Sequence, residues 1–227
     1  MVYNINMENV KLTDKIKRNI DFVRRHLVEN IYNLAILEGV AATYADTEAI
    51  VEGGRVRDMT TSDVQKIINL RRAWEFILDE NVITEKTDFN IICEINKIIG
   101  RDFYYNAGKV RNVPVNITGT SYKPPEPIES IIREELFDLL NEDNAMAKED
   151  RAVKLMIYLT KRQIFIDGNK RTAVISANHI FVSSGMGIIA VPAELTEEYK
   201  RLLVNYYEGS DDTQIVKFIK DHCVMRI

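Results

Sequence analysis

The chain has 227 residues, of which 46% are hydrophobic and 28% are charged, with only ten glycines and five prolines. These values are typical of a globular protein with one sizeable domain, and they exclude a disordered or fibrous chain. The formal net charge of −4 argues against a surface built to neutralise a phosphate backbone, so we expect no nucleic-acid partner.

Neither a targeting segment nor a metal-binding cysteine motif is evident. The amino terminus lacks the basic, then apolar, then small-residue pattern of a signal peptide, and no apolar run approaches the roughly 18 residues that span a bilayer. Cys93 and Cys223 have no CxxC partner or nearby histidine, which indicates buried thiols. We therefore expect a cytoplasmic protein that does not bind membranes.

The first half of the chain is predicted to be helical. Apolar residues recur at helical spacing over residues 12–45, which indicates one or two amphipathic helices. A short helical stretch, DTEAIVEGG, then ends on two glycines. The polar run TTSD at residues 60–63 offers helix caps for a long helix over 64–78, and a further helix is expected over 88–99.

The pattern changes in the segment RNVPVNITGTSYKPPEP, which begins at Arg111. Apolar residues alternate with polar ones, a turn is expected at Thr118–Gly119, and the segment ends at two prolines. This pattern predicts a short exposed β-hairpin.

Helical periodicity resumes after this segment and continues to the carboxyl terminus. Helices are expected over residues 128–140, 151–162, 169–183, 195–207 and 213–223. The sequence thus predicts an all-α domain over residues 61–227 with one β-hairpin flap, preceded by a helical amino-terminal segment over residues 1–60.

The strongest local feature is the stretch QIFIDGNKR, residues 163–171, which places a loop between two predicted helices. Unpaired backbone N–H groups and the helix dipole make such a helix start an anion site, and Gly168 lets a phosphate approach the backbone closely. Lys170 and Arg171 add positive charge. Asp167 fits this site if it binds a divalent cation that bridges phosphate oxygens. Alternatively, Asp167 only caps the helix and the two cations are solvated.

The same stretch resembles the Fic-family motif, His-x-Phe-x-Asp/Glu-Gly-Asn-Gly/Lys-Arg, at six positions. These are Phe165, Asp167, Gly168, Asn169, Lys170 and Arg171. The resemblance covers about residues 48–218, and it implies a Fic-type fold. Members of that family usually transfer AMP from ATP to a hydroxyl of a protein.

The resemblance also implies the roles of these residues. Phosphates would be bound by Gly168, Asn169, Lys170 and Arg171. Asp167 would bind Mg²⁺, and the hairpin flap would align a segment of the target protein. The docking residues of the flap would be Thr118, Gly119, Thr120, Ser121 and Tyr122.

Two departures from the motif affect the expected activity. Gln163 stands where the family carries its general-base histidine, and an amide cannot take up a proton near neutral pH. The three histidines of the chain, at positions 26, 179 and 222, do not obviously replace it. Val174 stands where many AMP-transferring members carry a second arginine. The Doc-like branch, which transfers phosphate, lacks this arginine and has Lys at the position of Lys170.

Two further features invite comparison with the family. The stretch EAIVEGG resembles its inhibitory helix, with Glu52 as the glutamate that would pair with Arg171; it can equally be read as a helix end with a glycine cap. Tyr206 and Tyr207 lie near where relatives hold adenine, although a tyrosine pair at a helix end is more often packing.

The sequence therefore indicates a Fic-like protein that binds Mg²⁺ and ATP or another nucleotide and has a protein partner. AMP transfer with reduced or lost activity is the leading expectation. Phosphate transfer and a non-catalytic, nucleotide-dependent binding module remain alternatives.

Overall fold

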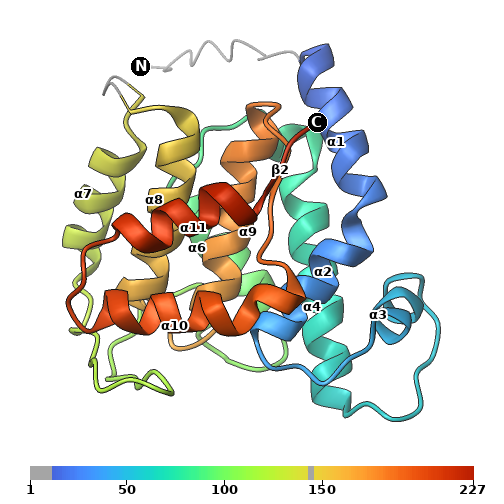
Figure 1. Ribbon diagram of the computed structural model, residues 1–227, viewed down its shortest axis with the longest axis horizontal. Coiled ribbons are helices and arrows are strands. Elements are labelled where there is room, and N and C mark those ends of the chain that lie inside the picture. The colour runs from blue at the N-terminus through green and yellow to red at the C-terminus, as the bar shows by residue number, and fades with distance from the viewer. Residues whose placement is uncertain (1–11, 143–145) are drawn as a thin grey trace, which may run out of the picture.

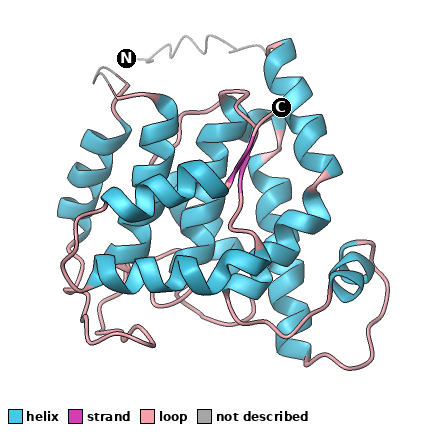
Figure 2. Ribbon diagram, viewed as in Figure 1, coloured by secondary structure: helices cyan, strands magenta, loops and turns pink. Residues whose placement is uncertain are grey.

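The structure, a computed structural model, describes residues 12–142 and 146–227. Within these ranges the protein has eleven α-helices, one short 3-10 helix and one two-stranded sheet (Figure 2). The all-α fold class is therefore confirmed. No helix in these ranges combines the length and apolarity that a membrane crossing requires.

The helices agree closely with the predicted ranges, and one short helix, α5, is additional. In chain order the elements are α1 (Asp14–Arg25), α2 (Leu27–Leu37), α3 (Tyr44–Val51), α4 (Thr61–Ile77), α5 (Glu80–Ile83), α6 (Phe89–Ile99), α7 (Glu129–Leu140), α8 (Lys148–Arg162), α9 (Asn169–Ser183), β1 (Ile188–Ile189), the 3-10 helix η1 (Ala193–Leu195), α10 (Thr196–Tyr207), α11 (Thr213–His222) and β2 (Val224–Met225).

Several helices begin at side chains that bond the first unpaired backbone N–H groups. The hydroxyl of Thr13 accepts from Ile16 at the start of α1, and that of Thr60 accepts from Asp63 at the start of α4. Thr43 caps α3 in a reciprocal arrangement with Asp46. These caps explain why the elements start close to the polar residues that the sequence offers.

The centre of the fold is α9, whose residues are almost all buried. It packs most extensively on α8, and also on α6, α4 and α1. Figure 1 shows α8 and α9 running side by side while α10 and α11 cross in front of them. A helix buried on every side holds both of its ends rigidly, so the loop at the start of α9 has a fixed position.

The amino-terminal helices contribute to the same core. Helix α2 packs on α4 and η1, whereas α3 packs on α2 and α4 and lies at the edge of the molecule (Figure 1). The apolar residues of α1 and α2 belong to one buried cluster with those of α8 and α9. The boundary near residue 60 stays a prediction.

The prediction of a β-hairpin after Arg111 is wrong, because its two strands do not form. Residues 111–125, here called the flap, form an extended loop with a turn at Thr118–Gly119 but without paired strands. The guanidinium of Arg111 donates to the carbonyls of Val113 and Pro125, one on each arm, so a side chain joins the arms where a strand ladder was expected. The sheet of the described chain pairs β1 with β2, antiparallel, with Ile188 opposite Met225.

Candidate functional site

The loop between α8 and α9, residues 163–168, turns the chain through two left-handed residues. Gln163 has φ 47° and ψ 56°, and Gly168 has φ 75°. A Cβ atom on Gly168 would lie 2.9 Å from Cγ2 of Ile99, so both the backbone angle and the available space require glycine there.

Asn169 holds the loop from inside. Its Nδ2 donates to the carbonyl of Phe165 at 2.9 Å and to Oε1 of Gln163 at 3.0 Å, while its Oδ1 accepts from the N–H of Phe165 at 3.0 Å. The side chain is buried and its hydrogen-bonding capacity is used within the loop. The side chain of Asn169 is therefore engaged within the loop and leaves its backbone N–H to a phosphate, and phosphate binding at Asn169 stays a prediction.

Asn96 of α6 braces the loop from the other side, and sequence reasoning missed it. Its Nδ2 donates to the carbonyl of Asp167 at 2.9 Å and to the hydroxyl of Thr172 at 3.0 Å, and its Oδ1 accepts from the N–H of Gly108. A buried, fully bonded amide on a helix face is a positioning group. Its polarity among the apolar positions of α6 was the signal that could have found it.

The start of α9 presents an unpaired row of backbone donors. Among the described residues, no acceptor lies at hydrogen-bond distance from the N–H groups of residues 166–171. The first bond of the helix runs from Thr172 to the carbonyl of Gly168. Together with the positive end of the helix dipole, these donors form the anion site that the sequence predicted.

Lys170 and Arg171 are paired with Glu38, the residue that follows α2. Nζ of Lys170 lies 3.2 Å from Oε1 of Glu38, an ion pair without hydrogen-bond alignment, and Nε of Arg171 donates to Oε2 at 3.0 Å. Arg171 also donates through Nη2 to Oδ2 of Asp167 at 2.6 Å. The Glu38 side chain is only 12% exposed and that of Arg171 only 7%. The carboxylate of Glu38 thus pairs with the two cations that an anionic ligand would need.

The expected pairing of Glu52 with Arg171 is consequently wrong. Glu52 is exposed at the end of α3, and Arg171 pairs with Glu38 and Asp167. The two glutamates have nearly the same local setting, because each caps the end of a helix and is followed by a glycine with positive φ. Glu38 was missed because this local signal does not tell which helix end faces α9.

A cavity of about 220 Å³ lies between the loop and the flap. Its walls combine the flap, the loop, the start of α9, Glu38 and the end of α10; the lining residues are Glu38, Val115, Asn116, Ile117, Thr118, Gln163, Ile166, Asp167, Gly168, Asn169, Lys170 and Tyr207. Half of the candidate residues from the sequence therefore surround one cavity, which is small for a nucleotide while Glu38 lies in it.

The two candidate adenine contacts differ in position. Tyr207 is buried, lines the cavity and stacks on Tyr122 of the flap, with ring centres 5.8 Å apart. Tyr206 is not among the lining residues and lies under Nζ of Lys161, 4.0 Å from its ring centre. Tyr207 stays a candidate contact, and Tyr206 packs against α8.

Arg111 anchors the base of the flap. It is 1% exposed, and besides its bonds to the two arms it donates through Nε to the carbonyl of Gln163 at 2.6 Å. Its own N–H donates to the carbonyl of Ile164 at 2.9 Å. Burial lowers the pKa of the guanidinium below its usual value. Arg111 thus fixes the flap to the loop and is not available to a phosphate.

No imidazole takes the place of a general base at Gln163. The Gln163 amide donates to the carbonyl of Thr160 at 2.7 Å and accepts from Asn169, so both of its ends are engaged. His179 is fully buried, donates through Nε2 to the carbonyl of Val82 and accepts from Thr87, and burial lowers its pKa. His26 and His222 are not among the cavity residues.

Val174 lies one turn beyond Arg171 and is buried. It borders a very small internal cavity with Leu34 and Leu37 of α2 and Trp74 of α4. An apolar contact with α2 therefore stands where many AMP-transferring Fic proteins carry an arginine, and Glu38 pairs with Lys170 and Arg171.

The donor set of the site fits a magnesium ion that is bound mainly by phosphates. Within residues 12–142 and 146–227 no group of three or more His, Cys, Asp or Glu side chains could hold a metal ion. Asp167 offers one carboxylate, 42% exposed, at the edge of the cavity. Mg²⁺ commonly takes one or two carboxylates, with waters and substrate phosphates as its other ligands.

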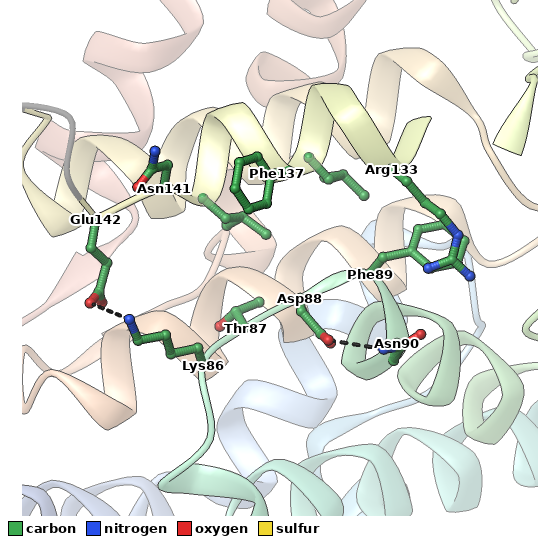
Figure 3. A pocket seen from close by; sticks show the side chains of 11 residues that line it. Lys86, Thr87, Asp88, Phe89, Asn90, Arg133, Phe137, Asn141 and Glu142 are labelled. Atoms are coloured by element: carbon green, nitrogen blue, oxygen red, sulfur yellow. Dashed lines mark hydrogen bonds and ion pairs between the residues drawn. The ribbon is translucent and has the colours of Figure 1, made fainter. Parts of the chain in front are cut away.

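A larger cavity, about 410 Å³, lies elsewhere, between α7 and the start of α6 (Figure 3). Lys86 reaches across it towards Glu142, at 3.3 Å, and Phe89 and Phe137 supply aromatic walls. It shares no lining residue with the cavity at the loop and contains neither the unpaired backbone donors nor the motif. The smaller cavity is therefore the candidate site.

The comparisons agree with this geometry. Residues 86–181 match the model of the Fic/DOC family. The chain is 27% identical over 175 residues to protein adenylyltransferase fic-1 of Caenorhabditis briggsae, an alignment that covers 74% of this chain and 34% of the relative.

Solved structures show the same fold. A segment of Fic-1 from C. elegans superposes with a TM-score of 0.72 at 22% identity, covering 94% of this chain and 69% of that one. A Fic-domain signalling protein from Bacteroides thetaiotaomicron gives a TM-score of 0.72 at 19% identity, covering 92% and 84%. The chain is thus similar to the Fic/DOC family over residues 86–181, and it spans between a third and two fifths of the length of the curated relatives it matches.

Proposed function

We propose that the chain binds Mg²⁺ and ATP at residues 163–171 and is an adenylyltransferase-type domain that modifies a protein hydroxyl. The observation that supports this most is the row of unpaired N–H groups at the start of α9, next to two cations and beneath the flap. The curated relative named above is a protein adenylyltransferase.

The phosphates are held by the backbone N–H groups of residues 168–171 and by the side chains of Lys170 and Arg171. Asp167 would hold Mg²⁺, and the ion would neutralise charge on the phosphate oxygens. Tyr207 contacts the base. Residues 118–122 of the flap, of which Thr118 lines the same cavity, align the target segment.

In AMP transfer, the oxygen of the target hydroxyl forms a bond to the α-phosphorus while the bond to pyrophosphate breaks. The products are the AMP-modified protein, pyrophosphate and one proton. Gln163 cannot accept that proton, so the proton passes to solvent and the reaction is slow. Positioning and charge stabilisation by this chain remain available.

Glu38 is the internal inhibitor of this site. Its carboxylate occupies the two cations that a nucleotide needs, and nucleotide phosphates compete with it for Lys170 and Arg171. The competition is direct because both ligands are anions and the same two side chains pair with them.

Two other functions are each favoured by one observation. Lys170 together with the apolar Val174 favours phosphate transfer of the Doc-like kind. The engagement of both ends of the Gln163 amide favours a non-catalytic module that binds nucleotide and a protein partner.

The test uses ATP labelled at the α- or the γ-phosphate, Mg²⁺ and a cell lysate. The parent chain is compared with its Gln163→His, Glu38→Gln and doubly substituted forms, and Glu52→Gln serves as the matched control. Transfer of α-label supports AMP transfer, and transfer of γ-label alone replaces it with phosphate transfer. Binding of Mg-ATP in calorimetry without any transfer supports the binding module, whereas absence of binding in every form contradicts the assignment of the loop.

A further inference from the structure

The flap is attached to the rest of the protein at its base and at its tip, and the contacts at these two places differ. At its base, the buried guanidinium of Arg111 bonds three carbonyls of the arms and the loop. At its tip, the contacts come from the carboxyl end of α10, which also supplies Tyr207 to the cavity wall. The contacts at the base are made by a buried side chain, while those at the tip are exposed.

Glu208, the residue that caps α10, forms the tip contact. Its Oε1 accepts from the hydroxyl of Thr120 at 2.8 Å and from the N–H of Ser121 at 3.3 Å. Thr120 also accepts, through Oγ1, from the N–H of Tyr122 at 3.1 Å. One carboxylate oxygen thus organises three successive flap residues.

An aromatic contact also attaches the tip of the flap to the end of α10. The ring of Tyr122 stacks on that of Tyr207 with an interplanar angle of 13°. Nζ of Lys161 lies 5.8 Å from the Tyr122 ring centre and donates to the carbonyl of Tyr206 at 2.9 Å. The carboxylate and the rings therefore pin the tip to one helix end.

The stretch between the base and the tip of the flap leaves its backbone N–H groups unpaired among the described residues. Among the described residues, no acceptor lies at hydrogen-bond distance from the N–H groups of residues 115–118, which border the cavity. Because this stretch forms no strand pairing, its position over the cavity depends on the contacts at the base and at the tip.

We propose that Glu208 is a positioning residue that latches the flap at Thr120 and Ser121 and thereby sets where a target segment lies relative to the nucleotide. This rests on the proposed function. Glu208 does not line the cavity, and its side-chain hydrogen bonds within the described part of the chain run to Thr120 and Ser121 of the flap, so it acts on target alignment without acting on nucleotide binding.

The first test is amide hydrogen exchange of the full chain, resolved at Ser121 and Tyr122. Glu208→Ala and Thr120→Val remove the latch, and both are expected to speed exchange at these two amides about two- to tenfold, the range of one net hydrogen bond. Glu208→Gln and Thr120→Ser keep the acceptor and the hydroxyl, so exchange stays near the parent rate. Glu197→Ala, at the exposed start of α10, is the matched control.

The second test measures transfer of α-label from ATP to lysate proteins in the Gln163→His form, with Mg-ATP affinity measured alongside. The expected result is a loss of transfer of severalfold in Glu208→Ala, rescue in Glu208→Gln, and unchanged Mg-ATP affinity in both. A purely structural role would not separate transfer from nucleotide affinity in this way.

Amide hydrogen exchange tests whether the latch exists even if the proposed function is wrong, because the measurement requires no nucleotide. Unchanged exchange at Ser121 and Tyr122 in both Glu208→Ala and Thr120→Val overturns the latch. Faster exchange together with transfer equal to the parent overturns the positioning role. Absence of Mg-ATP binding in the parent contradicts the proposed function and leaves the exchange result standing as the test of the latch.

Discussion

Replacing Glu38 with glutamine should weaken the fold and strengthen nucleotide binding at once. The substitution keeps the size of the side chain and removes the charge that Lys170 and Arg171 share. In the protein without nucleotide, Arg171 then retains Asp167 as its charged partner, while Lys170 loses its own. With nucleotide present, the phosphates no longer compete with a carboxylate.

The size of both effects follows from the burial of the pair. Hydrogen bonds to charged groups contribute about 1.5–3 kcal/mol, and removing one partner of a buried pair costs about 3–5 kcal/mol. Lys170 is 32% exposed and Glu38 only 12%, so solvent screens part of the interaction. We therefore expect a loss of about 1–3 kcal/mol in the stability of the nucleotide-free protein. This corresponds to a melting temperature lower by about 2–12 °C for a chain of this size.

The gain in affinity should have a similar magnitude because the same interaction no longer opposes binding. A relief of about 1.5–3 kcal/mol corresponds to about 10- to 100-fold tighter binding of Mg-ATP. Calorimetric titration and thermal melting, each with and without Mg-ATP, measure the two effects on the same samples. Glu52→Gln is the matched control, since that glutamate also caps a helix end and is exposed.

The reasoning is refuted if Glu38→Gln leaves Mg-ATP affinity unchanged, or if Glu52→Gln tightens it and Glu38→Gln does not. A fall in both stability and affinity would also contradict it, because Glu38 would then support the nucleotide site and not compete with the ligand.

Four further predictions follow from the site and the core. Gln163→His should raise α-label transfer by about 10²- to 10⁴-fold, the usual contribution of a general base; an equal gain in Gln163→Ala would show that removal of the glutamine, and not the imidazole, is responsible. Arg111→Met should destabilise the protein by about 3 kcal/mol in urea unfolding, because three carbonyls lose their donor; a near-neutral change would mean that the flap base is held by other contacts. Burial raises the pKa of the half-buried Cys93 thiol and of the buried Cys223 thiol to about 12. At pH 8 iodoacetamide should therefore alkylate the folded chain far more slowly than the unfolded chain, and rapid alkylation of Cys223 in the folded protein would contradict its burial. Since the folded-state pKa of these thiols lies above the unfolded value of about 9, the stability they contribute should be intact below pH 9 and decline as pH rises towards 12, which urea titrations at pH 8 and above pH 9 can measure.

Most of the helical fold could be predicted from the sequence because its signals are local. Apolar spacing and capping residues such as Thr60 placed the helices within a few residues of their observed ends. The segment after Arg111 shows the limit of this reasoning. Its alternation is real, but strand pairing also requires a partner edge, and the guanidinium of Arg111 joins the two arms instead.

The loop was also largely predictable, since glycine at 168 and cations at 170 and 171 have direct consequences for a helix start. The hydrogen-bond partners of its side chains could not be predicted. Asn169 and Gln163 bond each other inside the loop, and Asn96 reaches it from a helix more than 70 residues earlier in the chain. Periodicity carries no information about such distant partners.

The choice between Glu38 and Glu52 separates the two sources of information most clearly. The sequence alone determined that one helix ends near Glu52, before two glycines, and that the loop before α9 can bind an anion; the helix end at Glu38 came from the structure. Only the tertiary structure decided which glutamate reaches Lys170 and Arg171. Helix α2 buries Ile31, Leu34 and Leu37 in the core and so brings Glu38 beside α9, whereas α3 buries little and leaves Glu52 at the surface. The physical reason is that a charge finds its partner through the packing of its helix, and packing depends on every element that shares the core.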